Sequence, residues 1–133
     1  MSQHELIVNT NGRGAIDISS RVNALIDDLD VKLCHVFVAH TSASLMITGN
    51  EDPNLLLDVE DYFSTNVADA DPNYRHCGEG DFDMSGHIRS ILTGEAKTIP
   101  IIQGQLALGK FQGLYLYEHR AGNNTRKLII TLI

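Results

Sequence analysis

The chain has 133 residues, of which 43% are hydrophobic and 20% are charged, and no low-complexity run interrupts it. This length and composition predict one globular domain, residues 1–133, with a core of its own. The formal net charge of -7 and the scattered basic residues argue against a nucleic-acid partner, which requires a basic stripe. No apolar stretch approaches the ~20 residues of a membrane span, and the N-terminus lacks the order of a signal peptide. We therefore expect a cytoplasmic protein without a membrane partner.

The first two predicted strands, residues 4–10 and 14–19, flank an Asn11-Gly12 pair. Asn-Gly tolerates positive φ at both central positions of a tight turn, so the pair predicts a β-hairpin. One of the two serines that follow then caps a predicted helix. Its apolar residues fall at helical spacing and are Val22, Leu25, Ile26 and Leu29. We expect this helix to be a scaffold element.

Residues 31–40 form a predicted central strand. Apolar side chains alternate on both of its faces, which is typical of a strand covered on each side. Cys34 is expected to pack within it, and Cys34 and Cys77 are too few for a disulfide framework. His40 ends the strand and is followed by three hydroxyl residues in Thr41-Ser42-Ala43-Ser44. Two interpretations stay open: a turn whose hydroxyls bond their own backbone, or a functional site at a strand end.

Asp52-Pro53 marks the start of a second predicted helix, because proline suits the first turn. Its inward side chains at helical spacing are Leu56, Val59, Phe63 and Val67. This helix is expected to end near Ala70, and an acidic loop follows it.

Residues 74–87 concentrate the reactive side chains: two histidines, three carboxylates and one thiol. Asp81 is a suitable N-cap and Gly94 a suitable C-terminal stop for a third helix. The predicted apolar stripe of this helix is Met84, Ile88, Ile91 and Leu92. Gly86, inside the helix, indicates close approach of another backbone or of a ligand.

Asp83 and His87 lie four residues apart on this helix and therefore share a face. One interpretation is a core histidine satisfied by Asp83, which the absence of a fixed metal template such as H-E-x-x-H favours. The other is a metal or catalytic cluster in which His76 and His87 converge with help from Glu79 or Asp83.

Beyond Gly94 the apolar residues alternate and predict four strands, at 98–102, 105–108, 113–119 and 127–133. In the third of these, Glu118 continues an apolar row, and an unpaired carboxylate would be costly there. A cation such as Arg126 or a metal ion is expected to relieve that cost. The order of the elements predicts an α+β domain, in which helices pack against a largely antiparallel sheet.

Several short motifs occur in one order along most of the chain. They are His40-Thr41-Ser42-Ala43-Ser44-Leu45, Asp52-Pro53, Tyr74-Arg75-His76, Glu79-Gly80, Asp83-Met84, His87-Ile88-Arg89-Ser90, Gln112-Gly113 and Glu118-His119-Arg120. In this combination the chain resembles the YjbQ family, often labelled secondary thiamine-phosphate synthase, from about Gly14 to its end. The resemblance implies a small α+β homotrimer with clefts near subunit contacts. It also implies a weak thiamine phosphate synthase activity, which joins a pyrimidine diphosphate to a thiazole phosphate and releases pyrophosphate.

The resemblance suggests roles for several polar residues. His40, His76 and His87 look like the family's metal-binding histidines, so a divalent metal ion, zinc or magnesium, is the expected cofactor. The candidate acid, base or ring-orienting residues are His40, Glu79, Asp83 and Glu118. Gln112 and Arg126 match polar positions of the family, and Lys110 and Arg120 are added because their cationic side chains could hold phosphate. These four are the candidate residues for binding a small phosphorylated metabolite. The chain departs from the family at Gly49, where a glutamate is usual.

Two other functions stay open. Imidazole-rich sites suit zinc, whereas diphosphate chemistry commonly employs magnesium held by oxygen ligands, so a metal-dependent hydrolase is one alternative. The other is a non-catalytic trimeric protein that binds a metal or a metabolite, which the glycine at position 49 favours.

Overall fold

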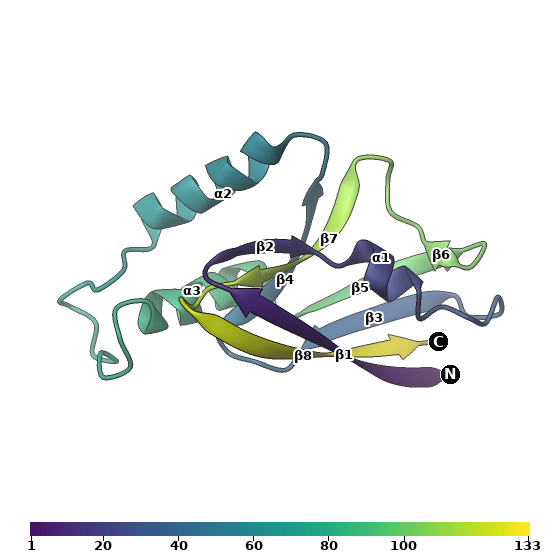
Figure 1. Cartoon of the computed structure of the whole chain (residues 1–133), viewed down its shortest axis with the longest axis horizontal. Helices are drawn as coiled ribbons and strands as arrows, with labels where there is room; N and C mark the ends of the chain where they lie inside the picture. Colours follow the sequence, from purple (N-terminus) through teal and green to yellow (C-terminus); the bar gives the residue numbers. More distant parts are fainter.

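The computed structural model describes residues 1–133 and contains two antiparallel sheets and three helices, as Figure 1 shows. The five-stranded sheet has the order β1 (Ser2–Asn11), β8 (Asn123–Leu132), β3 (Leu33–Val38), β5 (Ala96–Ile102) and β6 (Gln105–Leu106). The three-stranded sheet has the order β2 (Gly14–Asp17), β7 (Gln112–Glu118) and β4 (Ala43–Gly49). The helices are α1 (Ser19–Asn23), α2 (Pro53–Asn66) and α3 (Asp83–Thr93). The α+β prediction is confirmed, and no helix is long and apolar enough to cross a membrane.

The main hydrophobic core lies between the two sheets. Alternate residues of β3 and β8 enter it from the larger sheet, and alternate residues of β4 and β7 enter it from the smaller one. The fully buried members include Cys34, Val36, Leu128, Ile130, Leu132, Leu45, Leu114 and Leu116. Cys34 is a free thiol whose pKa burial raises to about 11, which confirms its packing role.

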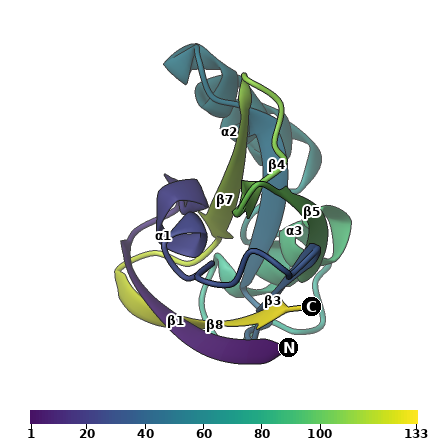
Figure 2. The same cartoon turned by 90° about the vertical axis from the view of Figure 1, so that its right-hand side faces the viewer.

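Helices α2 and α3 lie on the other side of the smaller sheet. Helix α3 packs along β4, whereas α2 reaches the sheet mainly through Phe63 and through Val67 directly after the helix, which pack with Tyr117 of β7. The N-terminal turn of α2 follows the end of β4 (Figures 1 and 2), and its Leu55 side chain lies beside Gly49 of that strand. Its predicted start is confirmed, because the Asp52 side chain accepts a hydrogen bond from the Asn54 amide and Pro53 occupies the first turn.

The predicted hairpin at Asn11-Gly12 is wrong as a pairing, although a turn is present. β1 pairs along its length with β8, and β2 pairs with β7, so the chain crosses from one sheet to the other at this point. Gly12 adopts a φ of +83°, and its amide donates to the Gly122 carbonyl. Local turn chemistry therefore acts as expected, while long-range pairing decides which strands become neighbours.

The first helix is shorter than predicted and spans only five residues. Neither serine caps it: the N-cap is Ile18, and the Ser19 hydroxyl accepts a hydrogen bond from the Leu114 amide of β7 instead. Leu25 and Ile26 still pack against the core from the following turns, while Leu29 is 74% exposed.

The third helix buries a different face from the one predicted. It begins at Asp83 with Phe82 as N-cap, so Asp81 does not cap it. Ile91 and Leu92 are 77% and 64% exposed. The buried residues are Asp83, Ser85, Gly86 and Arg89. These side chains bond polar groups of neighbouring elements, such as Arg13, Glu60 and Arg120. These polar contacts, rather than the spacing of the apolar residues, determine which face of the helix is buried.

The central strand β3 is covered on one face only within this chain, contrary to the sequence expectation. Cys34, Val36 and Val38 are buried, but Leu33 and Phe37 on the opposite face are 40% and 37% exposed.

Candidate functional site

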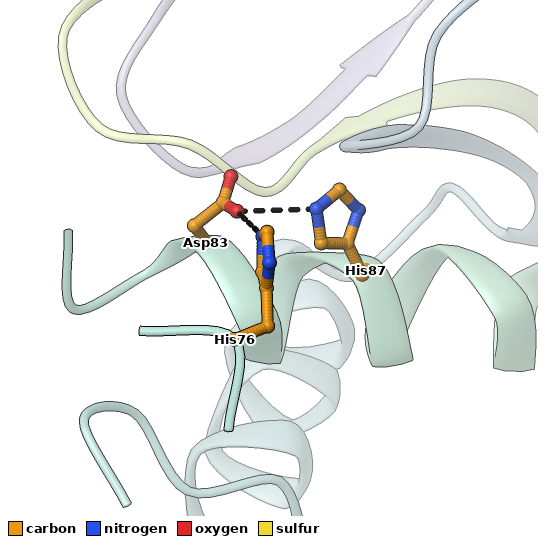
Figure 3. Close-up of side chains that lie close together, drawn as sticks. All are labelled: His76, Asp83 and His87. Carbon is orange, nitrogen blue, oxygen red and sulfur yellow. Dashed lines mark hydrogen bonds and ion pairs between the residues drawn. The ribbon is translucent and has the colours of Figure 1, made fainter. Parts of the chain in front are cut away.

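Asp83 is the centre of the polar cluster at the start of α3. His76, from the preceding loop, and His87, one turn along the helix, both direct Nε2 at the Asp83 Oδ2 atom, at 2.7 Å and 3.1 Å (Figure 3). The two imidazole rings lie 5.4 Å apart between centroids. The Asp83 side chain is only 3% exposed, whereas His76 and His87 are 51% and 25% exposed. The two partly exposed histidines therefore lie between the buried Asp83 carboxylate and solvent.

Asp83 is held in its ionised form by its neighbours. Burial opposes ionisation, but hydrogen bonds from Arg120 and His76 outweigh it and place the pKa of Asp83 below its ordinary value. Arg120 donates from Nη2 to Oδ1 at 2.8 Å, which leaves Oδ2 to the two histidines.

Each ring nitrogen of His87 faces an acceptor. Nδ1 lies 3.1 Å from the Thr41 carbonyl oxygen and Nε2 lies 3.1 Å from Asp83 Oδ2, and both oxygens can only accept. A neutral imidazole has a single N–H, so when Nδ1 donates to Thr41, the Nε2 lone pair and the carboxylate require a cation between them. A proton can serve, and so can a metal ion.

The ligand atoms of His76, Asp83 and His87 all lie within 4.8 Å of one another. Two imidazole nitrogens and one carboxylate oxygen form a donor set typical of zinc and related transition metals. The Thr41 carbonyl fixes the His87 ring, as is common for metal-bound histidines. The residues present therefore fit a divalent metal ion, with coordination positions left for water or substrate.

A cavity of about 670 Å³ borders the two histidines. It lies between α3 and the segment that ends β3. Its polar lining comes from His40, Thr41, His76, His87, Ser90 and Glu95, and its apolar lining from Phe37, Val38, Ala39, Ala43, Met84 and Ile91. No lysine or arginine lines it. This lining suits a mainly apolar or aromatic ligand body with one polar end at the histidines.

The structure brings together five of the residues singled out from the sequence, one of them Arg120, which bonds Asp83. His76, Asp83 and His87 form the cluster, and His40 lines the same cavity although it does not belong to the cluster of ligand atoms. Glu79 is exposed and lines a smaller depression of about 370 Å³ together with Asp83 and Arg120.

Glu118 and Arg126 form a buried bidentate ion pair at 2.7 Å, as the structural alternative for Glu118 anticipated. Burial opposes ionisation of Glu118, but hydrogen bonds from Arg126 and from the Thr10 hydroxyl bring its pKa below the ordinary value. Glu118 also accepts from the Arg120 amide at 3.1 Å. Neither side chain lines the histidine cavity, so Glu118 supports the site by holding the backbone that carries Arg120.

Lys110 and Gln112 lie at the opposite end of β7 from Glu118, roughly 20 Å away at strand rise. The Gln112 side chain accepts from the Gly109 amide, and Lys110 lies over the Phe111 ring. Within one chain these two residues are not brought to the histidines.

The sequence interpretation missed a buried polar network beneath α3. Arg89 is fully buried and donates to Glu60 of α2, which also accepts from the Tyr117 hydroxyl. On the same side, Arg13 pairs with Asp69 and donates to Ser85. The available signal was the small pair Ser85-Gly86 one turn before Arg89, since small residues let a helix pack closely and bury a neighbouring polar group.

Comparison with known proteins identifies relatives along nearly the whole chain. Residues 4–133 match the family described as UPF0047 protein YjbQ-like. The UPF0047 protein sll1880 of Synechocystis sp. is 42% identical over 132 residues, which are 96% of this chain and 90% of that protein. YjbQ of Escherichia coli O157:H7 is 35% identical over 133 residues, which are 98% of this chain and 96% of that protein.

Solved structures share the fold. The conserved hypothetical protein TT1486 of Thermus thermophilus superposes with a TM-score of 0.90 at 27% identity, over 98% of this chain and 99% of that one. A YjbQ/UPF0047 protein of Clostridium acetobutylicum gives a TM-score of 0.85 at 28% identity, over 100% of both chains. The resemblance drawn from the sequence motifs is confirmed, and the chain belongs to the YjbQ/UPF0047 family.

Proposed function

We propose that this chain holds one divalent metal ion between His76, Asp83 and His87 and uses it on a small phosphorylated metabolite in the adjacent cavity. The observation that carries the proposal is the convergence of two imidazole Nε2 atoms on one buried carboxylate oxygen. Nitrogen donors favour zinc or a related transition metal over magnesium, which prefers oxygen ligands.

A bound ion would supply positive charge that stabilises an anionic phosphate oxygen. The chain's own residues position the ion and the ligand. Arg120 fixes the orientation of Asp83 from the side away from the histidines. The apolar walls around Phe37, Met84 and Ile91 hold a ring system and exclude water from the polar end of the ligand.

The first reaction to test is the transfer that the family resemblance suggested, in which a thiazole phosphate displaces pyrophosphate from a pyrimidine diphosphate. A cavity of about 670 Å³ with apolar walls has room for a heteroaromatic ring beside the metal site. Gly49 lies outside this cavity, and a Cβ there would lie 2.8 Å from Cδ1 of Leu55, at the end of a flexible side chain of α2.

A metal-dependent hydrolase is the second candidate, and the distribution of basic residues favours it. Arg126 is occupied by Glu118, Lys110 lies at the far end of β7, and Arg120 is the one predicted cation beside Asp83. Two phosphorylated substrates bring more negative charge than one arginine and one metal ion balance. A single phosphate ester matches this charge more closely.

We also propose a homotrimer, supported by apolar side chains that this chain leaves exposed on β3, α2 and α3. The exposed fractions are 37% for Phe37, 62% for Leu57 and 77% for Ile91. Phe37 and Ile91 line the rim of the cavity, so a second copy over them would narrow its opening. Sedimentation equilibrium tests this point, and a monomer at micromolar concentration would contradict it.

Zinc titration of the metal-free protein by calorimetry tests the metal site. Wild type and the control His35→Ala, whose side chain contacts Thr98 outside the cavity, should each bind one zinc ion per chain. His76→Ala and His87→Ala should each weaken binding by at least tenfold, since each removes a ligand. Equal zinc binding by wild type and both variants would refute the site.

Product analysis then separates the candidate reactions. Zinc-loaded protein is incubated with the pyrimidine diphosphate and the thiazole phosphate, and with each alone. Thiamine phosphate formed only from the pair indicates the transferase, whereas phosphate released from a single substrate indicates the hydrolase. Zinc binding without either product would assign the chain to the non-catalytic metal- or metabolite-binding class.

A further inference from the structure

His40 differs from His87 in which ring nitrogen faces the protein backbone. The Ser42 amide donates a hydrogen bond to His40 Nδ1 at 3.0 Å. A backbone N–H can only donate, so Nδ1 of His40 must be the acceptor and cannot carry a proton. In the neutral ring the proton is then on Nε2. In His87, by contrast, Nδ1 faces an acceptor, the Thr41 carbonyl oxygen, so a proton on Nδ1 is compatible with a metal ion at Nε2.

The Nε2–H group of His40 is free to donate into the cavity. His40 lines the cavity, and no protein group accepts from its Nε2 atom. Burial, followed by the charges of Arg126 and Arg120, lowers the pKa of His40 and so favours the neutral ring. Metal binding through Nε2 would require the proton to move to Nδ1, where it would oppose the amide of the fully buried Ser42.

The set of candidate metal ligands is consistent with this distinction. The atoms within 4.8 Å of one another belong to His76, Asp83 and His87, and His40 is not among them. The cavity has no lysine or arginine in its lining, so a phosphate oxygen that enters it needs neutral donors besides the metal ion.

We propose that His40 is not a third metal ligand but the hydrogen-bond donor that binds an anionic phosphate oxygen through its Nε2–H group. The proposal rests on the proposed function for the identity of the ligand, a phosphorylated metabolite. The His40-to-Ser42 turn presets the donor, because the Ser42 amide holds the ring in one tautomer before the ligand arrives. Binding energy is then not spent on reorienting the imidazole.

Long-range ¹H–¹⁵N correlation spectroscopy of the metal-free protein tests the tautomer directly. The expected result is a protonated Nε2 in His40 at a pH where this ring is neutral, because the Ser42 amide occupies Nδ1. His40→Asn and His87→Ala spectra provide the assignments. A protonated Nδ1 in neutral His40 would overturn the proposal.

Two substitutions separate the two nitrogens of His40. In His40→Asn the amide oxygen still accepts from the Ser42 amide, but the donor at the Nε2 position is gone. In His40→Gln the side-chain amide reaches the Nε2 position and restores a donor. His35→Asn, on the strand that leads to His40 but outside the cavity, is the control.

Each zinc-loaded variant is titrated with inorganic phosphate. His40→Asn should bind zinc within about twofold of wild type yet bind phosphate about tenfold more weakly, the usual effect of one lost hydrogen bond to a charged group. His40→Gln should recover part of the phosphate affinity. Loss of zinc in His40→Asn comparable with that in His87→Ala would show that His40 is a ligand, and unchanged phosphate affinity would remove its role as donor.

Failure of the proposed metal site is distinguishable from failure of this inference. A wild-type protein that takes up no zinc refutes the metal site alone. The role of His40 is then decided in the metal-free protein, where the same tautomer and a weaker phosphate affinity of His40→Asn are still required. Equal phosphate affinity there would overturn the inference.

Discussion

His119 makes the stability of this protein depend on pH in a predictable way. The side chain is fully buried beneath α3, where Nε2 lies 2.8 Å from the Ser44 hydroxyl and Nδ1 has no partner. Burial, and then the charges of Arg89 and Arg13, lower the pKa of His119 from 6.5 to about 3. The folded protein therefore keeps this ring neutral under conditions in which an unfolded chain protonates it.

The sign and size of the effect follow from the two pKa values. Between about pH 3 and pH 6.5 the unfolded state binds one more proton at this residue than the folded state, so stability falls as pH falls. The slope approaches about 1.4 kcal/mol per pH unit. From about pH 6.5 to about pH 5, His119 alone should lower the free energy of unfolding by about 2 kcal/mol.

Urea unfolding at these two pH values measures the effect. His119→Gln keeps a polar group near the Ser44 hydroxyl and removes the titrating ring, so its loss of stability should be about 2 kcal/mol smaller than that of wild type. His4→Gln near the start of β1 is the control for removal of one histidine, and it should retain the loss caused by His119. An equal loss of stability in wild type and His119→Gln would refute a buried neutral histidine.

Three further predictions follow from buried groups. Arg126→Met should lower the free energy of unfolding by about 3–5 kcal/mol, because it leaves the buried Glu118 carboxylate without its ion-pair partner. Adding Glu118→Leu should restore much of that loss. Urea unfolding in which the double variant is no more stable than Arg126→Met would contradict this. Gly86→Ala should raise the stability by about 0.5–1 kcal/mol, because its Cβ would lie 3.4 Å from the nearest side-chain atom, whereas Gly86→Leu should lower it, and thermal melts decide both signs. A thiol reagent should modify Cys77 in the native protein and both cysteines only after denaturation, since burial raises the pKa of Cys34 to about 11; rapid modification of Cys34 in the native state would contradict the packed core.

Local signals in the sequence predict much of the fold. The Asp52-Pro53 start of α2 and the strands around Leu114 and Leu128 follow from capping and from alternation, because these depend on neighbouring residues alone. The Asn11-Gly12 turn also forms, but its strands join different sheets. Pairing partners are set by contacts between segments about a hundred residues or more apart, and turn chemistry contains no information about them.

The buried face of α3 could not be found from hydrophobic periodicity. Helices normally bury their apolar stripe, yet here Arg89 and Asp83 are buried while Ile91 is exposed. The polar face is stabilised by partners on other elements, such as Glu60 of α2 and Arg120 after β7. Such partners become neighbours only through the tertiary fold, so the sequence pattern alone favours the wrong face.

The candidate site was predictable in part. The spacing of Asp83 and His87 predicted their contact, and the structure places them 3.1 Å apart. The approach of His76 depends on the loop before α3, for which no periodic signal exists. The difference between His40 and His87 depends on which backbone groups face each ring, and a sequence does not reveal that.

X-ray absorption at the zinc edge of the loaded protein tests the central claim most directly. The account predicts a spectrum with two imidazole ligands and light-atom donors, among them the Asp83 carboxylate, and it predicts that His87→Ala loses one imidazole while His40→Asn loses none. A spectrum with three imidazoles, with sulfur from Cys77, or with no change in His87→Ala would contradict it.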